Sequence, residues 1–163
     1  MANSTERVII ESMMQLYVHD FSANWAGTSY GDVDDRGRFA AYPLDPYWSR
    51  ADHIPWLIRQ NGQLAGFCLT NVDSHIGRAI DRNVAEFFIL RKYRGHGVGM
   101  TAAHALFARK PGIWEVAVET QNPQAVEFWR RTVHGCRAAR DVEEVEMRSP
   151  DWNGPVLHFR ISA

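Results

Sequence analysis

Cysteine is scarce in this sequence, and its scarcity excludes two kinds of stabilisation. Of the 163 residues only Cys68 and Cys136 are cysteines, too few for a disulfide framework or a multi-cysteine metal site. Long apolar runs are also missing, since a membrane helix requires about 20 such residues. Glu6 and Glu11 interrupt the first 20 residues, which therefore do not resemble a signal peptide. These absences predict a cytoplasmic protein with no metal and no membrane partner.

A strong excess of charge of either sign is missing as well. The formal net charge is −1, which argues against a nucleic-acid-binding protein. The distribution is uneven, because residues 91–110 contain several basic side chains and no acidic one. Such a basic patch suits a small polyphosphate ligand. A solvated helix end would explain Arg109 and Lys110 equally well, but it explains Arg94 less well.

Hydrophobic periodicity predicts one domain, residues 1–163, of the α/β class. A first helix should begin at a capping box formed by Asn3 and Glu6, and Asn61-Gly62 indicates a tight hairpin. A strand–helix–strand unit follows, so we expect a mixed, mostly antiparallel central sheet with helices on both faces. The expected helices are 5–20, 97–109 and 123–134, and the expected strands are 54–59, 64–71, 83–90, 113–119, 138–147 and 155–162.

The segment from Val84 to Gly99 is the most informative part of the chain. It combines an apolar strand, a short basic turn and the sequence Arg94-Gly95-His96-Gly97-Val98-Gly99 at the start of a helix. Three glycines let the backbone curl tightly and approach a ligand closely. Backbone N–H groups at a helix N-terminus bind phosphate oxygens. The segment therefore predicts a site for a phosphorylated cofactor.

Two other nucleotide sites can be compared with this pattern. Gly97-x-Gly99-x-x-Ala102 fits a dinucleotide fingerprint, with Glu115 or Glu119 about 20 residues further on. However, a hairpin precedes the motif, and only about 60 residues follow it, too few for the repeated parallel units of that fold. A Walker loop is excluded because no Gly-Lys-Ser/Thr follows the glycines.

A second motif identifies a family. Arg94–Gly99 is similar to the acyl-CoA signature of the GNAT superfamily of N-acetyltransferases, Arg/Gln-x-x-Gly-x-Gly/Ala. Asn122–Trp129 resembles the family's later segment, Asn-x-x-Ala-x-x-hydrophobic-Tyr. The two motifs cover about residues 84–131, and the order of elements extends the similarity over most of the chain. The resemblance implies a GNAT-like fold, acetyl-CoA as co-substrate and transfer of its acetyl group to a primary amine.

The same resemblance implies how coenzyme A is bound. The pyrophosphate should lie on the N–H groups of residues 95–99, where Arg94 supplies charge or shapes the turn. The pantetheine arm should enter a gap where strand 83–90 splays from the next strand, and Asn122 should bond its amide region. His96 is expected to contribute its backbone rather than its ring. The implied cofactor-binding residues are Ile89, Leu90, Arg94, Gly95, His96, Gly97, Val98, Gly99, Asn122, Ala125 and Trp129.

Glu86 is the candidate catalytic base. It is the only ionisable residue inside strand 83–90, and apolar neighbours would raise its pKa toward the range that a base requires. Some family members carry a glutamate base on this strand. The alternative is a structural Glu86 that faces solvent or pairs with an arginine.

The expected general acid is missing. Trp129 occupies the place where the family often has a tyrosine that protonates the thiolate, and an indole N–H does not release a proton usefully. A non-catalytic acyl-CoA-binding module, acting as a sensor or partner subunit, is therefore the alternative function.

The acceptor should lie against the first helix and the long loop at residues 22–52. The carboxylates and aromatic rings of this loop suit a small cationic amine, although a solvated loop whose rings close the core would look the same. The family usually begins with a strand, but only Met1–Ser4 precede the helix here, so that strand is short or absent. The sequence leaves the oligomeric state open, a homodimer included. The loop residues concerned are Asp32, Asp34, Asp35, Asp45, Asp52, Tyr30, Tyr42, Tyr47 and Trp48.

Overall fold

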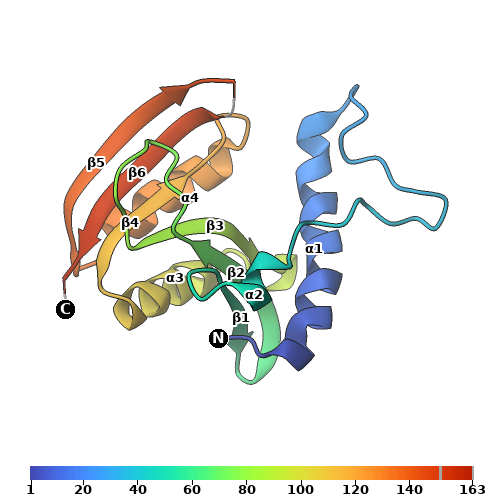
Figure 1. Cartoon of the computed structure of the whole chain (residues 1–163), viewed down its shortest axis with the longest axis horizontal. Coiled ribbons are helices and arrows are strands. Elements are labelled where there is room, and N and C mark those ends of the chain that lie inside the picture. The colour runs from blue at the N-terminus through green and yellow to red at the C-terminus, as the bar shows by residue number, and fades with distance from the viewer. Residues whose placement is uncertain (151, 163) are drawn as a thin grey trace.

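The computed structural model describes residues 1–150 and 152–162 and has the mixed α/β architecture expected from the sequence (Figure 1). Short 3-10 turns occupy Ser4–Glu6, Ala23–Trp25 and Arg91–Tyr93. The helices are α1 (Arg7–Ser22), α2 (Pro46–Ser49), α3 (Val98–Arg109) and α4 (Pro123–His134). The strands are β1 (Ile54–Gln60), β2 (Gln63–Asn71), β3 (Arg82–Ile89), β4 (Gly112–Ala117), β5 (Ala139–Arg148) and β6 (Asn153–Ile161).

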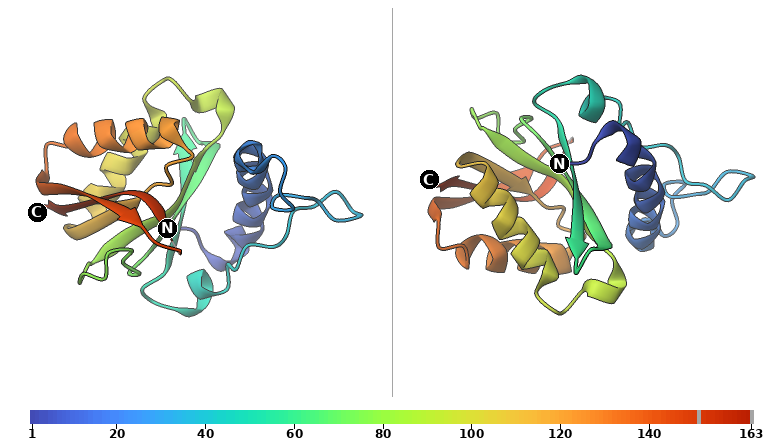
Figure 2. Two further views of the ribbon diagram at one scale, coloured as in Figure 1. Left: turned by 90° about the horizontal axis from the view of Figure 1, so that it is seen from above. Right: turned by 90° about the horizontal axis from the view of Figure 1, so that it is seen from below.

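One sheet with two helical faces organises the molecule. In the described residues its strand order is β1-β2-β3-β4-β6-β5, and every neighbouring pair is antiparallel except β3–β4. Helix α1 covers one face, and α3 and α4 cover the other (Figure 2). Ile10 of α1 packs with Phe67 and Phe88 of the sheet. On the opposite face Phe107 of α3 packs with Trp114.

Local sequence signals account for several element ends. The Oδ1 atom of Asn3 accepts from the N–H of Glu6, and the Glu6 carboxylate accepts from the N–H of Asn3, so the capping box is confirmed. Asn61 and Gly62 adopt positive φ angles of 50° and 79°, as a tight hairpin between β1 and β2 requires. Pro123 opens α4, whose expected bounds are confirmed.

The N-terminal region contains no strand among the described residues. A single backbone hydrogen bond, from the N–H of Ala2 to the carbonyl of Pro55 at 2.8 Å, joins the segment before α1 to strand β1. The middle of the loop at residues 26–45 extends away from the sheet (Figure 1), and its end returns to the sheet, where Leu44 is buried beside Phe67. In the part of the chain that is described, no helix combines the length and apolarity needed to cross a membrane.

Strands β3 and β4 pair over only two positions. The parallel register joins Arg82 to Trp114 and Asn83 to Glu115. Beyond these positions β3 continues to pair with β2, and β4 continues to pair with β6. The two strands therefore diverge, which confirms the splay that the family resemblance implies. We refer to the paired positions as the closed end of the splay, and to the region around Glu86 and Glu119 as its open end.

Candidate active site

A β-bulge in β3 sets the direction of Glu86. Leu69 of β2 pairs with Glu86, whereas the next residue, Thr70, pairs with Val84, so Ala85 is an extra residue in β3. A bulge interrupts the alternation of side chains and re-aims those that follow it. Glu86 consequently points toward the face of the sheet that α1 covers.

Two tyrosines hold the carboxylate of Glu86 on that face. The hydroxyl of Tyr17, in α1, donates to Oε2 at 2.5 Å, and the hydroxyl of Tyr42, in the long loop, donates to Oε1 at 2.8 Å. The structural alternative for Glu86, exposure to solvent or pairing with an arginine, does not describe this arrangement. Tyr17 is not among the residues that the sequence predicted for the site, so its polar contact with Glu86 was missed.

The surroundings of Glu86 favour its protonated form. Burial raises the pKa of Glu86, the two tyrosine hydrogen bonds lower it in part, and the negative charge of Glu119 raises it further; the net shift is upward. Burial and the charge of Glu86 also raise the pKa of Tyr17 and that of Tyr42. Both phenols therefore remain protonated donors. A carboxylate with a raised pKa can act as a general base near neutral pH.

Glu119 is a second carboxylate at the open end. It follows the end of β4, four residues beyond Glu115, while Glu86 is three residues beyond Asn83 on the other strand. The two glutamates thus stand on the diverging arms of the splay. Sequence reasoning considered Glu119 only as part of the dinucleotide alternative.

A third glutamate lies at the closed end of the splay. Glu115 is fully buried; it accepts from the hydroxyl of Ser74 at 2.6 Å and the N–H of His75 at 2.5 Å, and Nδ1 of His75 lies 3.2 Å away. Burial alone would raise the pKa of Glu115, but the hydrogen bonds from His75 and Ser74 outweigh it and hold the pKa below its ordinary value. This carboxylate anchors the β2–β3 loop to β4.

The glycine turn before α3 is open on the side where side chains would stand. Gly95 and Gly97 both have φ angles of 77°, and no atom lies within 4 Å of where a Cβ would stand on either residue. Gly97 forms the N-terminal cap of α3, which begins with Val98. An open turn with left-handed glycines at a helix N-terminus fits the pyrophosphate of coenzyme A.

Gly99 serves a different purpose. Its φ angle lies outside the left-handed range, and an added Cβ would stand 3.1 Å from the ring of Phe128 in α4. The expectation that all three glycines curl the backbone is therefore wrong for Gly99. It is a glycine because α3 and α4 approach closely there.

Two contacts hold the side chain of Arg94, one to the end of β3 and one to α1. Its Nε donates to the carbonyl of Ile89 at 2.7 Å, and its Nη2 pairs with Asp20 of α1 at 2.5 Å. The ring of His96 also contacts the turn, with Nδ1 2.7 Å from the carbonyl of Arg94. The N–H of Leu90 donates to the backbone of β2. Arg94 thus shapes the turn, as one of its two expected roles requires.

The second motif forms the start and the buried side of α4. Oδ1 of Asn122 accepts from the N–H of Ala125 at 3.1 Å, which caps the helix. Trp129 is 6% exposed and packs against Phe87 and Phe128, with ring centroids 5.1 Å and 5.0 Å away. Its ring is a core element beside the splay.

The aspartates of the long loop have structural partners. Asp34 accepts from backbone N–H groups of its own loop. Asp45 pairs with Arg7 at 2.7 Å, and Asp52 pairs with Arg50 at 2.9 Å. For these three carboxylates the structure favours the solvated-loop alternative over acceptor binding. Tyr42 is the residue that this loop contributes to Glu86.

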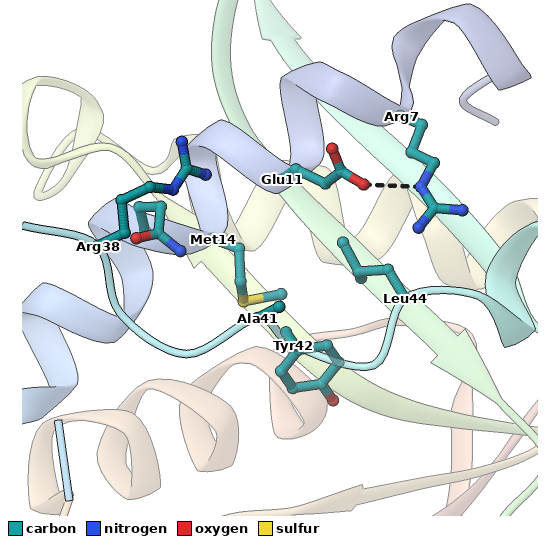
Figure 3. Close-up of a pocket in the computed structure, with 8 residues that line it drawn as sticks. Arg7, Glu11, Met14, Arg38, Ala41, Tyr42 and Leu44 are labelled. Atoms are coloured by element: carbon teal, nitrogen blue, oxygen red, sulfur yellow. Dashed lines mark hydrogen bonds and ion pairs between the residues drawn. The ribbon is translucent and has the colours of Figure 1, made fainter. Parts of the chain in front are cut away.

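A cavity of about 270 Å³ lies between α1 and the segment 38–44 (Figure 3). Arg7 and Arg38 carry positive charge into its lining, and Glu11, which pairs with Arg7, carries negative charge. With two arginines and one glutamate in its lining, this cavity suits a cationic acceptor less well than the open end of the splay does. No group of metal-ligating side chains occurs among the described residues. The cavity is lined by Arg7, Glu11, Met14, Gln15, Arg38, Ala41, Tyr42 and Leu44.

Comparisons with known proteins agree with this geometry. The sequence model of the acetyltransferase (GNAT) family matches residues 10–134. An acetyltransferase from Thermus thermophilus has a TM-score of 0.61 at 16% identity, over 91% of this chain and 88% of that one. The aminoglycoside acetyltransferase AAC(6')-Ib, in complex with coenzyme A and kanamycin, has a TM-score of 0.55 at 13% identity, over 91% and 87%. No functionally curated protein matches.

Proposed function

The chain belongs to the GNAT family of acetyltransferases, and from this premise we propose that it acetylates a primary amine of a small cationic molecule. As a family member it is an acyltransferase with acetyl-CoA as co-substrate. The observation that carries the proposed acceptor is the position of Glu86. This carboxylate stands at the open end of the splay, with two tyrosines oriented toward it and a second carboxylate nearby.

The glycine turn and the splay supply the proposed cofactor site. The N–H groups of residues 95–99 would hold the pyrophosphate, because the turn is open and begins a helix. The pantetheine arm would lie along the end of β3. The carbonyl of Ile89 already accepts from Arg94, but a carbonyl oxygen has a second lone pair for another donor. Leu90, Asn122, Ala125 and Trp129 would border the same arm.

Glu86 would act on the acceptor amine. An amine attacks a thioester only in its neutral form, so a base must accept its proton. The raised pKa of Glu86 makes it a stronger base than an exposed glutamate, and Tyr17 and Tyr42 fix its orientation. The buried indole of Trp129 cannot protonate the departing thiolate, which would then take its proton from water.

The charge at the open end supports a cationic acceptor. Glu86 and Glu119 both lie there, and the hydroxyl of Tyr42, which donates to Glu86, points away from the arginines that line the other cavity (Figure 3). A protonated amine is attracted to two carboxylates before it loses its proton. Kanamycin, which is bound by the structurally similar aminoglycoside acetyltransferase, belongs to the same chemical class.

Two measurements test this proposal. Acetyl-CoA at millimolar concentration should raise the melting temperature, because a ligand that binds only the native state stabilises it. Free thiol should then be released in the presence of primary amines, and small cationic amines should give the highest kcat/KM. Stabilisation without thiol release from any amine would contradict the proposed acceptor, and would point instead to a module that only binds acyl-CoA.

A further inference from the structure

A second cavity opens beside Glu119. It has a volume of about 190 Å³ and lies between the segment that follows β4 and the turn that joins β5 to β6. Neither of these segments contributes to the glycine turn or donates a hydrogen bond to Glu86. The described residues that line it are Glu119, Gln121, Ser149, Pro150, Trp152 and Asn153.

Backbone contacts hold the two walls of this cavity together. The N–H of Thr120 donates to the carbonyl of Asn153 at 3.0 Å, and the N–H of Val118 donates to the carbonyl of Pro155 at 3.0 Å. A Cβ on Gly154 would stand 2.1 Å from the carbonyl oxygen of Val118, so only glycine permits this approach. The walls are therefore formed before a ligand arrives, which reduces the entropy cost of binding.

The chemistry of the lining selects a cation. Among the described lining residues only Glu119 is charged, and Trp152 adds an aromatic ring. That ring packs against His75 with centroids 4.5 Å apart, which restrains its position. A carboxylate together with an indole ring attracts an ammonium group by charge and by cation–π contact.

This cavity lies at the open end of the splay, because Glu119 is one of its lining residues. Glu86 and Glu119 lie three and four residues beyond the last paired positions of the neighbouring strands β3 and β4, and the charge of Glu119 acts on both Glu86 and Tyr17. Both carboxylates therefore border the open end of the splay. We propose that this cavity, here called the Glu119 subsite, binds a second ammonium group of the acceptor, so that the preferred acceptor is a diamine or polyamine.

This inference rests on the proposed function and is tested with matched amines. We would compare 1,4-diaminobutane with 1-aminobutane, which share a carbon chain and differ by one ammonium group. The wild-type enzyme should have a KM for the diamine at least about tenfold lower, because a charged hydrogen bond contributes about 1.5–3 kcal/mol. Glu119→Gln should raise the KM for the diamine by about the same factor, and so remove most of the difference between the two amines.

A matched control and a binding measurement make the test decisive. Glu146→Gln removes one carboxylate from the exposed surface of β5 and should leave both KM values unchanged. Thermal stabilisation by each amine in the presence of coenzyme A reports binding without turnover. Equal KM values and equal stabilisation for the two amines in the wild-type enzyme would overturn the Glu119 subsite while leaving amine acetylation intact. If no amine is acetylated, the proposed function fails, and stabilisation by the diamine alone would still support the subsite.

Discussion

The two ends of the β3–β4 splay each hold a glutamate, and the two carboxylates behave in opposite ways. Glu115 at the closed end is fully buried, and its pKa lies below the ordinary value. Glu86 at the open end is only partly buried, and its pKa lies above that value. Desolvation raises the pKa of both carboxylates, so the opposite directions of the net shifts depend on the hydrogen bonds and charges around each one.

The difference lies in what each carboxylate faces. Glu115 accepts hydrogen bonds from the hydroxyl of Ser74 and from the backbone N–H of His75, and Nδ1 of the His75 ring also lies close to it. Glu86 receives two phenolic hydrogen bonds and faces the negative charge of Glu119. One end of the splay thus uses a carboxylate to fix a loop, and the other end leaves a carboxylate ready to accept a proton.

The largest effect should follow removal of the carboxylate at the open end. Glu86→Gln should lower kcat at neutral pH by about 10²- to 10⁴-fold, the usual contribution of a general base. The loss should shrink at high pH, where the amine is already neutral. Thiol release measured across the pH range checks this. An unchanged pH–rate profile would remove Glu86 from the chemistry.

Removal of the carboxylate at the closed end should affect stability instead. Glu115→Gln should lower the free energy of unfolding by about 1–3 kcal/mol, because buried donors lose a charged acceptor. Its lowered pKa means that Glu115 stabilises the fold above the pKa of the unfolded state, and that this stability is lost as the pH falls through the native pKa. Denaturant titrations at several pH values measure both effects, and kcat should stay within about threefold of the wild-type value.

A large loss of activity in Glu115→Gln with unchanged stability would show that the closed end takes part in the reaction. Glu146→Gln is a suitable control for both glutamate variants, because it removes one negative charge from the exposed surface of β5.

A smaller change should follow loss of one phenol at the open end. Tyr42→Phe removes a hydrogen bond that lowers the pKa of Glu86, so the pKa should rise and the acid limb of kcat/KM should move to higher pH. At neutral pH kcat/KM should fall by about fivefold, as expected for one hydrogen bond of about 1 kcal/mol. An acid limb that moves to lower pH would contradict the assignment of Tyr42 as a donor to Glu86.

The smallest change should follow loss of the charge opposite Glu86. Glu119→Gln removes a charge that raises the pKa of Glu86, so the acid limb should move to lower pH, opposite to Tyr42→Phe. With 1-aminobutane as acceptor, kcat should change by less than about threefold, because solvent screens charges that are not in contact. Shifts of the two variants in the same direction would show that the neighbours of Glu86 do not act independently on its pKa.

Local signals made several features of the molecule predictable. The glycine turn, the Asn3 capping box and the bounds of α4 depend on neighbours within a few residues, and each was found from the sequence. The surroundings of Glu86 and Glu115 depend on distant contacts. Glu86 and Glu115 look alike in the sequence, each a glutamate among apolar strand residues. Only the tertiary partners, Tyr17 and Tyr42 for one and the Ser74–His75 segment for the other, distinguish them.

The bulge at Ala85 could not be predicted from the sequence either. No glycine or proline marks it in Val84-Ala85-Glu86-Phe87, and its position follows from the pairing of β3 with β2. The sequence left two interpretations of the loop aspartates open, acceptor binding and a solvated loop. Their composition suits a cationic ligand, but Asp45 and Asp52 are paired with arginines, which composition alone does not reveal.

The contrast between the two glutamates is tested most directly by titrating both carboxyl groups in one sample. Carbon-13 NMR of protein labelled at the glutamate carboxyl carbon would follow them, with Glu86→Gln and Glu115→Gln used to assign the two signals. We expect Glu86 to titrate above, and Glu115 below, the pKa of an exposed glutamate. A Glu86 carboxyl that titrates at or below the pKa of Glu115 would contradict it.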